Sequence, residues 1–256
     1  ASCVAVFVGH PVESVKVRMQ TAQHLHERNI GTRFRSLVRQ PFYGIGPHLV
    51  QYVMFSTIRF GAFSAAKDFF QRRHTAEAPA GQDPVRLSLW EIFASGLFSG
   101  FCLGLATHPL YVVKTHQQVN RLGTMTAAKS LWQGEGVRGF GRTYLAGLVR
   151  FPLAGGVVFG VYEALERHAL PPLPAEGGAR GHTIEPLWRM IYGATAGIVG
   201  WTVIYPLDVA QNGVIGQATY GAARKYTGVL DCGRTLLRER GLATFARGYS
   251  AVLLRA

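Results

Sequence analysis

The stretch His108-Pro109-Leu110-Tyr111-Val112-Val113-Lys114 decides the fold, because the chain repeats its pattern twice more. Residues 10–16 and 205–211 each place a proline one position after a histidine or a tyrosine. A lysine or glutamine follows each proline by five positions. The repeated prolines, 98 and 97 residues apart, are Pro11, Pro109 and Pro206. Self-similarity at a fixed period indicates an architecture built from copies of one unit.

A second register repeats in step with the first. Gly44, Thr143 and Gly248 each precede by seven residues another set of polar side chains, which are Gln51, Arg150 and Arg255. We therefore expect one domain over 1–256, with repeats over about 1–75, 85–170 and 186–256. Measured against the middle repeat, the first lacks the start of its opening helix, and the third stops as its second helix begins. The first helix is thus expected to be clipped and the sixth to be missing.

Hydropathy and charge predict membrane-spanning helices. Hydrophobic residues make up 48% of the chain and charged residues 16%, and the net charge is +13. The positive charge suits a phosphate-bearing partner, and the apolar content favours an anionic membrane over nucleic acid. A membrane span needs about 20 residues. The helices that we expect run over roughly 1–20, 45–73, 85–118, 141–170 and 186–215.

Two further patterns support helices that pack within a membrane. Basic side chains, such as Arg33, Arg138 and Arg234, gather in the segments between the two helices of each repeat, which places those segments on one side. The spacings Gly96/Gly100 and Gly193/Gly197 predict close approach of helix backbones. A soluble helical solenoid is the alternative to this interpretation.

The remaining motifs argue against metals, cofactors and catalysis. Cys3, Cys102 and Cys232 lack the paired spacing of a zinc site or a disulfide framework. His24 and His26 have no third metal ligand nearby in the sequence. The glycine-rich stretches lack the Gly-Lys-Ser/Thr of a phosphate-binding loop, and no catalytic triad or carboxylate pair is present. We therefore expect no metal, no cofactor and no enzymatic activity.

Pro-x-acid-x-x-base, recurring in membrane-length helices, resembles the mitochondrial carrier family, and the similarity runs over the whole chain. The resemblance implies an all-α membrane fold of three pseudo-symmetric two-helix repeats around a central cavity. It also implies a multi-pass protein of the mitochondrial inner membrane, with three short helices on the matrix side. A carrier of this family is expected to work by alternating access, as a monomer, with antiport as its mode.

The resemblance assigns a gate on the matrix side to the residues that follow the prolines. Proline kinks a helix by removing a backbone hydrogen bond, which turns the following segment toward the threefold axis. The implied gate consists of the pairs Glu13 with Lys114 and Asp208 with Lys16, and Tyr111 and Gln211 take the third place. A hydrogen bond between Tyr111 and Gln211 could substitute for that missing pair. Gln20 and Gln118 match the glutamines that brace such ion pairs in the family. The alternative for these charged residues is a static buried network that does not open.

The same resemblance places substrate contacts at Gln51, Arg150 and Arg255. Arginine presents a planar fork that matches a carboxylate or phosphate, so an anionic or zwitterionic substrate is expected. Arg150 resembles the arginine found here in carriers of amino acids, carnitine esters and carboxylates, and Phe151 stands where amino-acid carriers tend to have an acid. Phe151 or Tyr52 could bind a quaternary ammonium group by cation–π contact. Alternatively, the arginines bond backbone carbonyls or phospholipid.

The family's second gate, on the opposite side, is only partly matched. Lys67 follows Phe63-Ser64 as the base, whereas Glu166 follows Tyr162-Glu163 where a base is expected. We therefore expect the cavity to rest open toward the intermembrane space. Gly44 and Arg247-Gly248 resemble head-group sites for cardiolipin.

These features together predict transport of a small anionic or zwitterionic metabolite. The competing prediction is a divergent protein of carrier fold that has a structural or partner-binding role and no transport.

Overall fold

The structure, a computed structural model, describes residues 45–77, 86–120, 122–168, 181–217, 225–246 and 248–249, together with His10, Glu13, Ser14, Lys16 and Val17. These residues contain helices and turns and no strand. The helices of this part of the chain are α3 (Ile45–Glu77), α4 (Leu89–Asn120), α5 (Thr124–Glu135), α6 (Val137–Gly141), α7 (Tyr144–His168), α8 (Gly181–Gly216), α9 (Val229–Arg240) and the 3₁₀ helix η2 (Leu242–Ala246).

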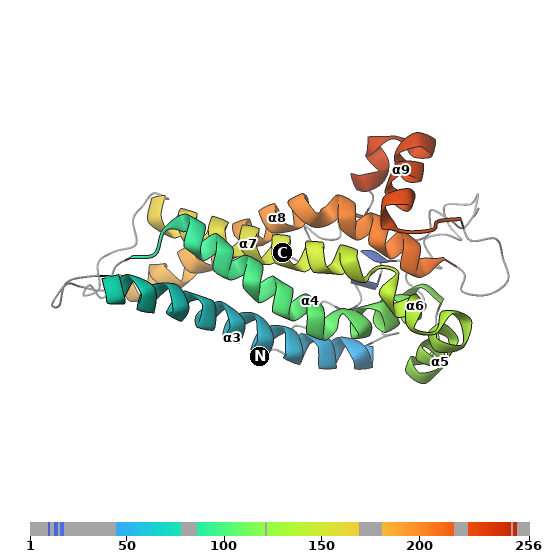
Figure 1. The fold of residues 1–256 in the computed structure, drawn as a ribbon. Helices are drawn as coiled ribbons and strands as arrows, with labels where there is room; N and C mark the ends of the chain where they lie inside the picture. The colour runs from blue at the N-terminus through green and yellow to red at the C-terminus, as the bar shows by residue number, and fades with distance from the viewer. Residues whose placement is uncertain are drawn as a thin grey trace.

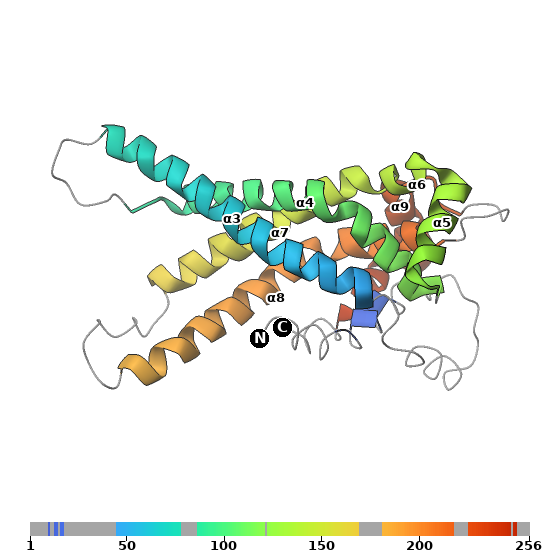
Figure 2. The same ribbon diagram turned by 90° about the horizontal axis from the view of Figure 1, so that it is seen from below.

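Four long helices form the body of the molecule. Helices α3, α4, α7 and α8 pack in chain order, each against the next. In Figure 2 they fan out, so that α3 and α8 diverge toward the end where α3 finishes. The shorter helices α5, α6 and α9 lie at the opposite end of the bundle (Figure 1). This common placement agrees with the side assigned to the basic segments from the sequence.

The helix bounds match the expected bounds within a few residues, except for the helix expected over 1–20, most of which lies outside the described residues. Three helical segments are long and apolar enough to cross a membrane: Leu89–Asn120, Tyr144–His168 and Leu187–Gly216. Large apolar side chains on them, such as Trp90, Leu145 and Met190, are exposed. Exposed side chains of this size suit contact with lipid.

Glycines let α4 and α7 pack backbone against backbone. A Cβ atom added to Gly100 would lie 2.2 Å from the Phe151 carbonyl oxygen, and one added to Gly96 would lie 2.6 Å from that of Gly155. The close approach predicted at Gly96/Gly100 is therefore present. Such contacts hold membrane helices together where water supplies no hydrophobic drive.

The corresponding prediction for Gly193 and Gly197 on α8 stays a prediction, because most of the segment after η2, the counterpart of α7 in the third repeat, lies outside the described residues. Among the described residues, a Cβ atom at either position would meet nothing within 4 Å. Helix α8 contacts α7 closely at Gly200, where a Cβ atom would lie 2.5 Å from Val158 Cγ2. Gly197 lines the central cavity, so its face of the helix borders open space.

Equivalent contacts recur around the two described prolines. Helix α4 continues through Pro109 and α8 continues through Pro206. His108 Nε2 lies 3.2 Å from Thr143 Oγ1, at the start of α7. Tyr205, which precedes the next proline, packs its ring 5.1 Å from the ring of Tyr249. Each proline region thus contacts the segment that begins the second helix of its own repeat, which agrees with a repeated architecture.

Candidate functional site

A cavity of about 340 Å³ lies between the long helices. Gln51, Phe55 and Arg59 line it from α3, four residues apart. The register of the repeats makes their equivalents Arg150, Ala154 and Val158, which line the cavity from α7. Residues four apart share a face of a helix. The two repeats therefore present equivalent stripes to one cavity, as the sequence register requires.

Two ion pairs close one end of this cavity. Lys114 Nζ lies 2.5 Å from Glu13 Oε1, and Lys16 Nζ lies 2.7 Å from Asp208 Oδ2. These are the two pairs assigned from the sequence, and each joins segments from different repeats. The side chains of Lys16, Lys114 and Asp208 are less than a tenth exposed. Buried charges of this kind need their partners, because an unpaired charge is costly away from water.

The third position of the ring differs from the expectation. Tyr111 donates its hydroxyl hydrogen bond toward Asn212 Oδ1 at 2.6 Å, and Asp208 Oδ1 lies 3.2 Å away. Gln211 instead donates to the backbone oxygen of Thr143 at 3.4 Å. The expected Tyr111–Gln211 hydrogen bond is therefore not the contact made. Asp208 and Asn212 lie one turn apart on the face of α8 that meets Tyr111, whereas Gln211 turns toward the start of α7.

Asp208 is the centre of a larger charged cluster than the sequence indicated. Arg150 Nη1 lies 2.8 Å from Asp208 Oδ1, so one carboxylate pairs with both Arg150 and Lys16. Lys16 also lies 4.1 Å from the centre of the Trp201 ring. Sharing of one carboxylate between two cations ties α7, α8 and the first repeat together at the floor of the cavity.

Arg150 is held by a carboxylate and two aromatic rings, and at least one of its N–H donors has no acceptor among the described residues. Its side chain is 5% exposed, and its guanidinium carbon lies 4.5 Å from the Tyr111 ring centre and 4.4 Å from that of Phe151. Its Nε–H is buried and has no hydrogen-bond acceptor among the described residues. Arg150 binds the Asp208 carboxylate, rather than the backbone carbonyl or phospholipid of the alternative interpretation. An arginine that borders a cavity with a free donor is suited to bind an anionic group.

Other residues assigned from the sequence have mixed outcomes. Gln118 donates to Ser14 Oγ at 3.3 Å, one turn beyond the Glu13–Lys114 pair and between the same two segments. Several assigned residues lie outside the described part of the chain: Pro11, Gln20, His24, His26, Gly44, Arg247 and Arg255.

At the far end of the cavity, the residues of the second gate are held within their own helices. Glu163 pairs with Arg167, one turn further along α7, at 2.7 Å. Lys67 lies 5.7 Å from the ring of Phe63, on its own helix α3. Phe63 in turn stacks on Phe159 of α7, with ring centres 3.8 Å apart. The contact across the two helices is thus aromatic, which agrees with a weak gate on this side.

Two residues of the cavity, Arg59 and Trp201, were not assigned to the substrate site from the sequence. The charge of Arg59 in a membrane-length helix predicts that it faces a protein-lined or watery interior, but neither residue occupies a motif position, so the repeat comparison could not assign it a role. The four-residue spacing from Gln51 through Phe55 to Arg59 was the available signal, because it places an arginine on the stripe that contains a substrate-contact position.

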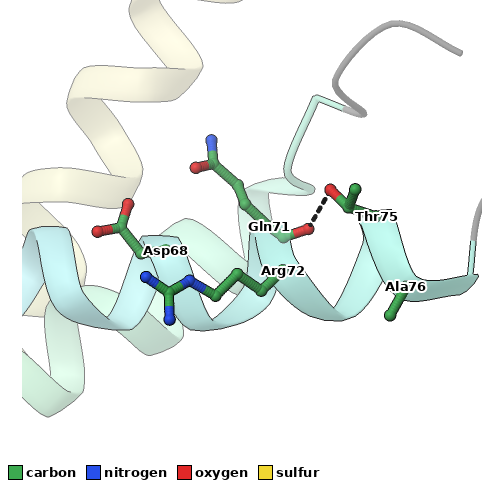
Figure 3. Close-up of a pocket in the computed structure, with 5 residues that line it drawn as sticks. All are labelled: Asp68, Gln71, Arg72, Thr75 and Ala76. Atoms are coloured by element: carbon green, nitrogen blue, oxygen red, sulfur yellow. Dashed lines mark hydrogen bonds between the residues drawn. The ribbon is translucent and has the colours of Figure 1, made fainter. Parts of the chain in front are cut away.

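A second hollow lies on the outer end of α3 (Figure 3) and is lined by Asp68, Gln71, Arg72, Thr75 and Ala76. All of these residues come from one helix face, and all are exposed. The hydrogen bond drawn there joins Thr75 to the Gln71 backbone oxygen and belongs to the helix itself. The hollow is thus an open helix surface, and the candidate site is the central cavity.

The family comparison agrees with this geometry. The family model described as mitochondrial carrier protein matches residues 1–74, 85–171 and 182–256. The chain belongs to the mitochondrial carrier family. It is 29% identical to the human mitochondrial basic amino acids transporter over 98% of this chain and 80% of that protein. It is 30% identical to the mouse mitochondrial carnitine/acylcarnitine carrier protein over 98% of this chain and 84% of that protein.

Family membership and the apolar helices together define the general role. The protein is a multi-pass carrier of the mitochondrial inner membrane and transports a small metabolite.

Proposed function

We propose that this carrier transports a zwitterionic metabolite of the amino-acid or carnitine-ester class, and that Arg150 binds its carboxylate. The observation that carries the proposal is the state of Arg150, which borders the cavity and already binds one carboxylate, that of Asp208, while its Nε–H has no acceptor among the described residues. Gln51 shares the cavity from the equivalent position of the first repeat. Arg255, at the third equivalent position, is proposed to contribute in the same way.

The cationic part of such a substrate would bind aromatic and acidic groups of the cavity. The ring of Phe151 already contacts the Arg150 guanidinium, so Phe151 serves to orient Arg150. Tyr52 and Phe55 also line the cavity and offer ring faces to an ammonium group. The two relatives are named for basic amino acids and for carnitine, compounds that combine a carboxylate with a cationic nitrogen.

Substrate binding would be coupled to opening of the matrix gate through Asp208. A substrate carboxylate that takes the Arg150 fork competes with Asp208, which then keeps Lys16 as its remaining cationic partner. A ligand shifts a conformational equilibrium by its differential affinity for the two states. Loss of the Arg150–Asp208 contact would release α7 from α8 at the floor of the cavity, which is a movement that opening of the gate would need.

Other properties follow from the family and from charge. We propose that the substrate crosses chemically unchanged, by antiport, and that the carrier works as a single-domain monomer. Gln20 and Gln118 would brace the gate, and Pro11, Pro109 and Pro206 would kink the helices that carry it. The segments that contain Gly44 and Arg247-Gly248 would bind cardiolipin head groups.

Counterflow into liposomes tests the proposal. Purified protein would be reconstituted and assayed with labelled L-arginine, L-lysine, carnitine, acylcarnitine and a dicarboxylate. We expect uptake of at least one zwitterion, recovered unchanged by mass spectrometry. Arg150→Ala should abolish that uptake, and Arg150→Lys should retain part of it, because lysine keeps the charge but loses the planar fork.

Two results would count against the proposal. Uptake that is unchanged in Arg150→Ala would remove this residue from the site. Correctly folded wild-type protein that exchanges no compound of a broad metabolite panel would favour the alternative of a carrier fold retained for a structural or partner-binding role.

A further inference from the structure

Among the described residues, Arg59 is the second guanidinium group that lines the cavity, and the repeat register does not account for it. It lies on the same stripe of α3 as Gln51, eight residues and about 12 Å further along the helix. The equivalent position of the second repeat is Val158, which also lines the cavity. The first two repeats thus present an arginine and a valine at the same level, so of these two repeats only the α3 side carries a positive charge here.

The surroundings of Arg59 are aromatic. Its guanidinium carbon lies 5.1 Å from the ring centre of Phe55 and 5.0 Å from that of Phe159 on α7. No carboxylate pairs with it in the part of the chain that the structure describes. Arg150 differs in this respect, because its guanidinium is bonded to Asp208. Arg59 is therefore a cavity cation whose N–H donors have no acidic partner among the described residues.

The two guanidinium groups occupy separate levels of the cavity. Arg59 lies against Phe159 and Arg150 lies against Phe151, and these phenylalanines are eight residues apart on α7. Eight residues of helix correspond to about 12 Å. One carboxylate accordingly contacts only one of the two arginines at a time. Arg59 follows Gln51 along α3, whose last residues lie at the end of the bundle where α3 and α8 diverge (Figure 2).

We infer that Arg59 is an additional anion-binding residue, which receives the carboxylate of the metabolite before that carboxylate reaches Arg150. This inference rests on the proposed function of the cavity. The two rings hold the guanidinium plane in place by stacking, and the N–H groups at its edge remain able to bind a carboxylate in a bidentate manner. A cation at the wider end also raises the local concentration of an anionic substrate.

The test compares Arg59→Gln and Arg59→Lys with a matched control, Arg72→Gln. Arg72 lies on the same helix and loses the same charge, but it is exposed and lies outside the cavity lining. In counterflow, Arg59→Gln should raise KM for L-arginine or carnitine about tenfold, the effect of one charge-assisted contact, with kcat nearly unchanged. Arg59→Lys should fall between this variant and wild type, and Arg72→Gln should match wild type.

Competitors without a carboxylate separate binding from a merely structural role. L-Argininamide and choline, used as inhibitors, should have the same inhibition constant with wild type and with Arg59→Gln. An unchanged KM in Arg59→Gln would overturn the inference. A loss of affinity that is equal for L-arginine and L-argininamide would also overturn it, because the effect would then not concern the carboxylate.

A binding measurement keeps this inference separate from the proposed function. L-Arginine or carnitine should raise the melting temperature of the detergent-solubilised wild-type protein, and Arg59→Gln should show less of this increase than Arg72→Gln. If wild type transports neither compound, the proposed function fails. The ligand-induced shifts in melting temperature still test whether Arg59 binds the carboxylate. Equal stabilisation of the two variants, or none of wild type, would overturn the role of Arg59.

Discussion

At the scale of single residues, Asp208 contacts more residues of the site than its motif predicted. The resemblance to the carrier family predicted its pairing with Lys16, and the structure adds Arg150 and the Tyr111 hydroxyl. The resemblance could not predict these contacts, because it assigns Arg150 to the substrate site and pairs Tyr111 with Gln211. The sequence thus predicts contacts within one motif and misses contacts between different motifs.

Asp208→Asn should therefore be more damaging than Glu13→Gln. The first substitution leaves the buried cations of Lys16 and Arg150 without their shared anion. The second breaks the ion pair with one lysine, Lys114, and the Glu13 side chain is 14% exposed. Breaking a buried pair costs about 3 kcal/mol or more. Thermal unfolding in detergent should show a larger loss of melting temperature for Asp208→Asn. Equal losses in the two variants would contradict the central position of Asp208.

At the scale of elements, the contact between α4 and α7 depends on glycine. Gly100→Ala should destabilise the protein by about 1–3 kcal/mol, because the new methyl group would overlap the Phe151 carbonyl. Gly61→Ala on α3 is the matched control, since a Cβ atom there meets nothing within 4 Å. That substitution should be neutral or stabilising by up to about 1 kcal/mol, from helix propensity alone. Melting temperatures in the opposite order would show that α4 and α7 are further apart.

Helix α9 offers a second test of packing at this scale. Cys232 is fully buried between α9 and α8, close to Val209 and Tyr226. Burial raises the pKa of its thiol to about 12. Only the thiolate reacts with maleimide, so at pH 8 a fraction of about 10⁻⁴ is reactive, and this fraction rises about tenfold per pH unit.

In a Cys3→Ser/Cys102→Ser variant, maleimide should therefore label Cys232 only after denaturation. Mass spectrometry of native and denatured samples measures this difference directly. Rapid labelling of the native protein at pH 8 would mean that α9 does not pack on α8 as described.

The elements themselves were the most predictable part of the molecule. Apolar runs of membrane length gave the bounds of α4, α7 and α8, because burial in lipid requires them whatever the neighbouring helix is. The neighbouring helix that a given helix face contacts was less predictable. Helix α8 contacts α7 closely at Gly200, a position that no motif marked, since helix rotation depends on all neighbours together.

At the scale of the whole molecule, the arrangement is that of a carrier closed on the side of the short helices. The ion pairs Glu13–Lys114 and Lys16–Asp208 lie at that end, and the long helices diverge at the other. Arg150→Cys, in a variant without other cysteines, should consequently react with a membrane-impermeant thiol reagent added from the intermembrane-space side. Blocked labelling from that side would contradict the orientation of the cavity.

The central claim is that the ion pairs at the floor of the cavity break and re-form during transport. The most direct test exchanges the charges of one pair, with counterflow into liposomes as the measurement. Glu13→Lys and Lys114→Glu should each reduce exchange about tenfold or more, because each leaves two like charges face to face. The double variant Glu13→Lys/Lys114→Glu should recover most of the lost rate, since the pair re-forms with its polarity reversed. A double variant no more active than the single variants, or single variants as active as wild type, would contradict the account.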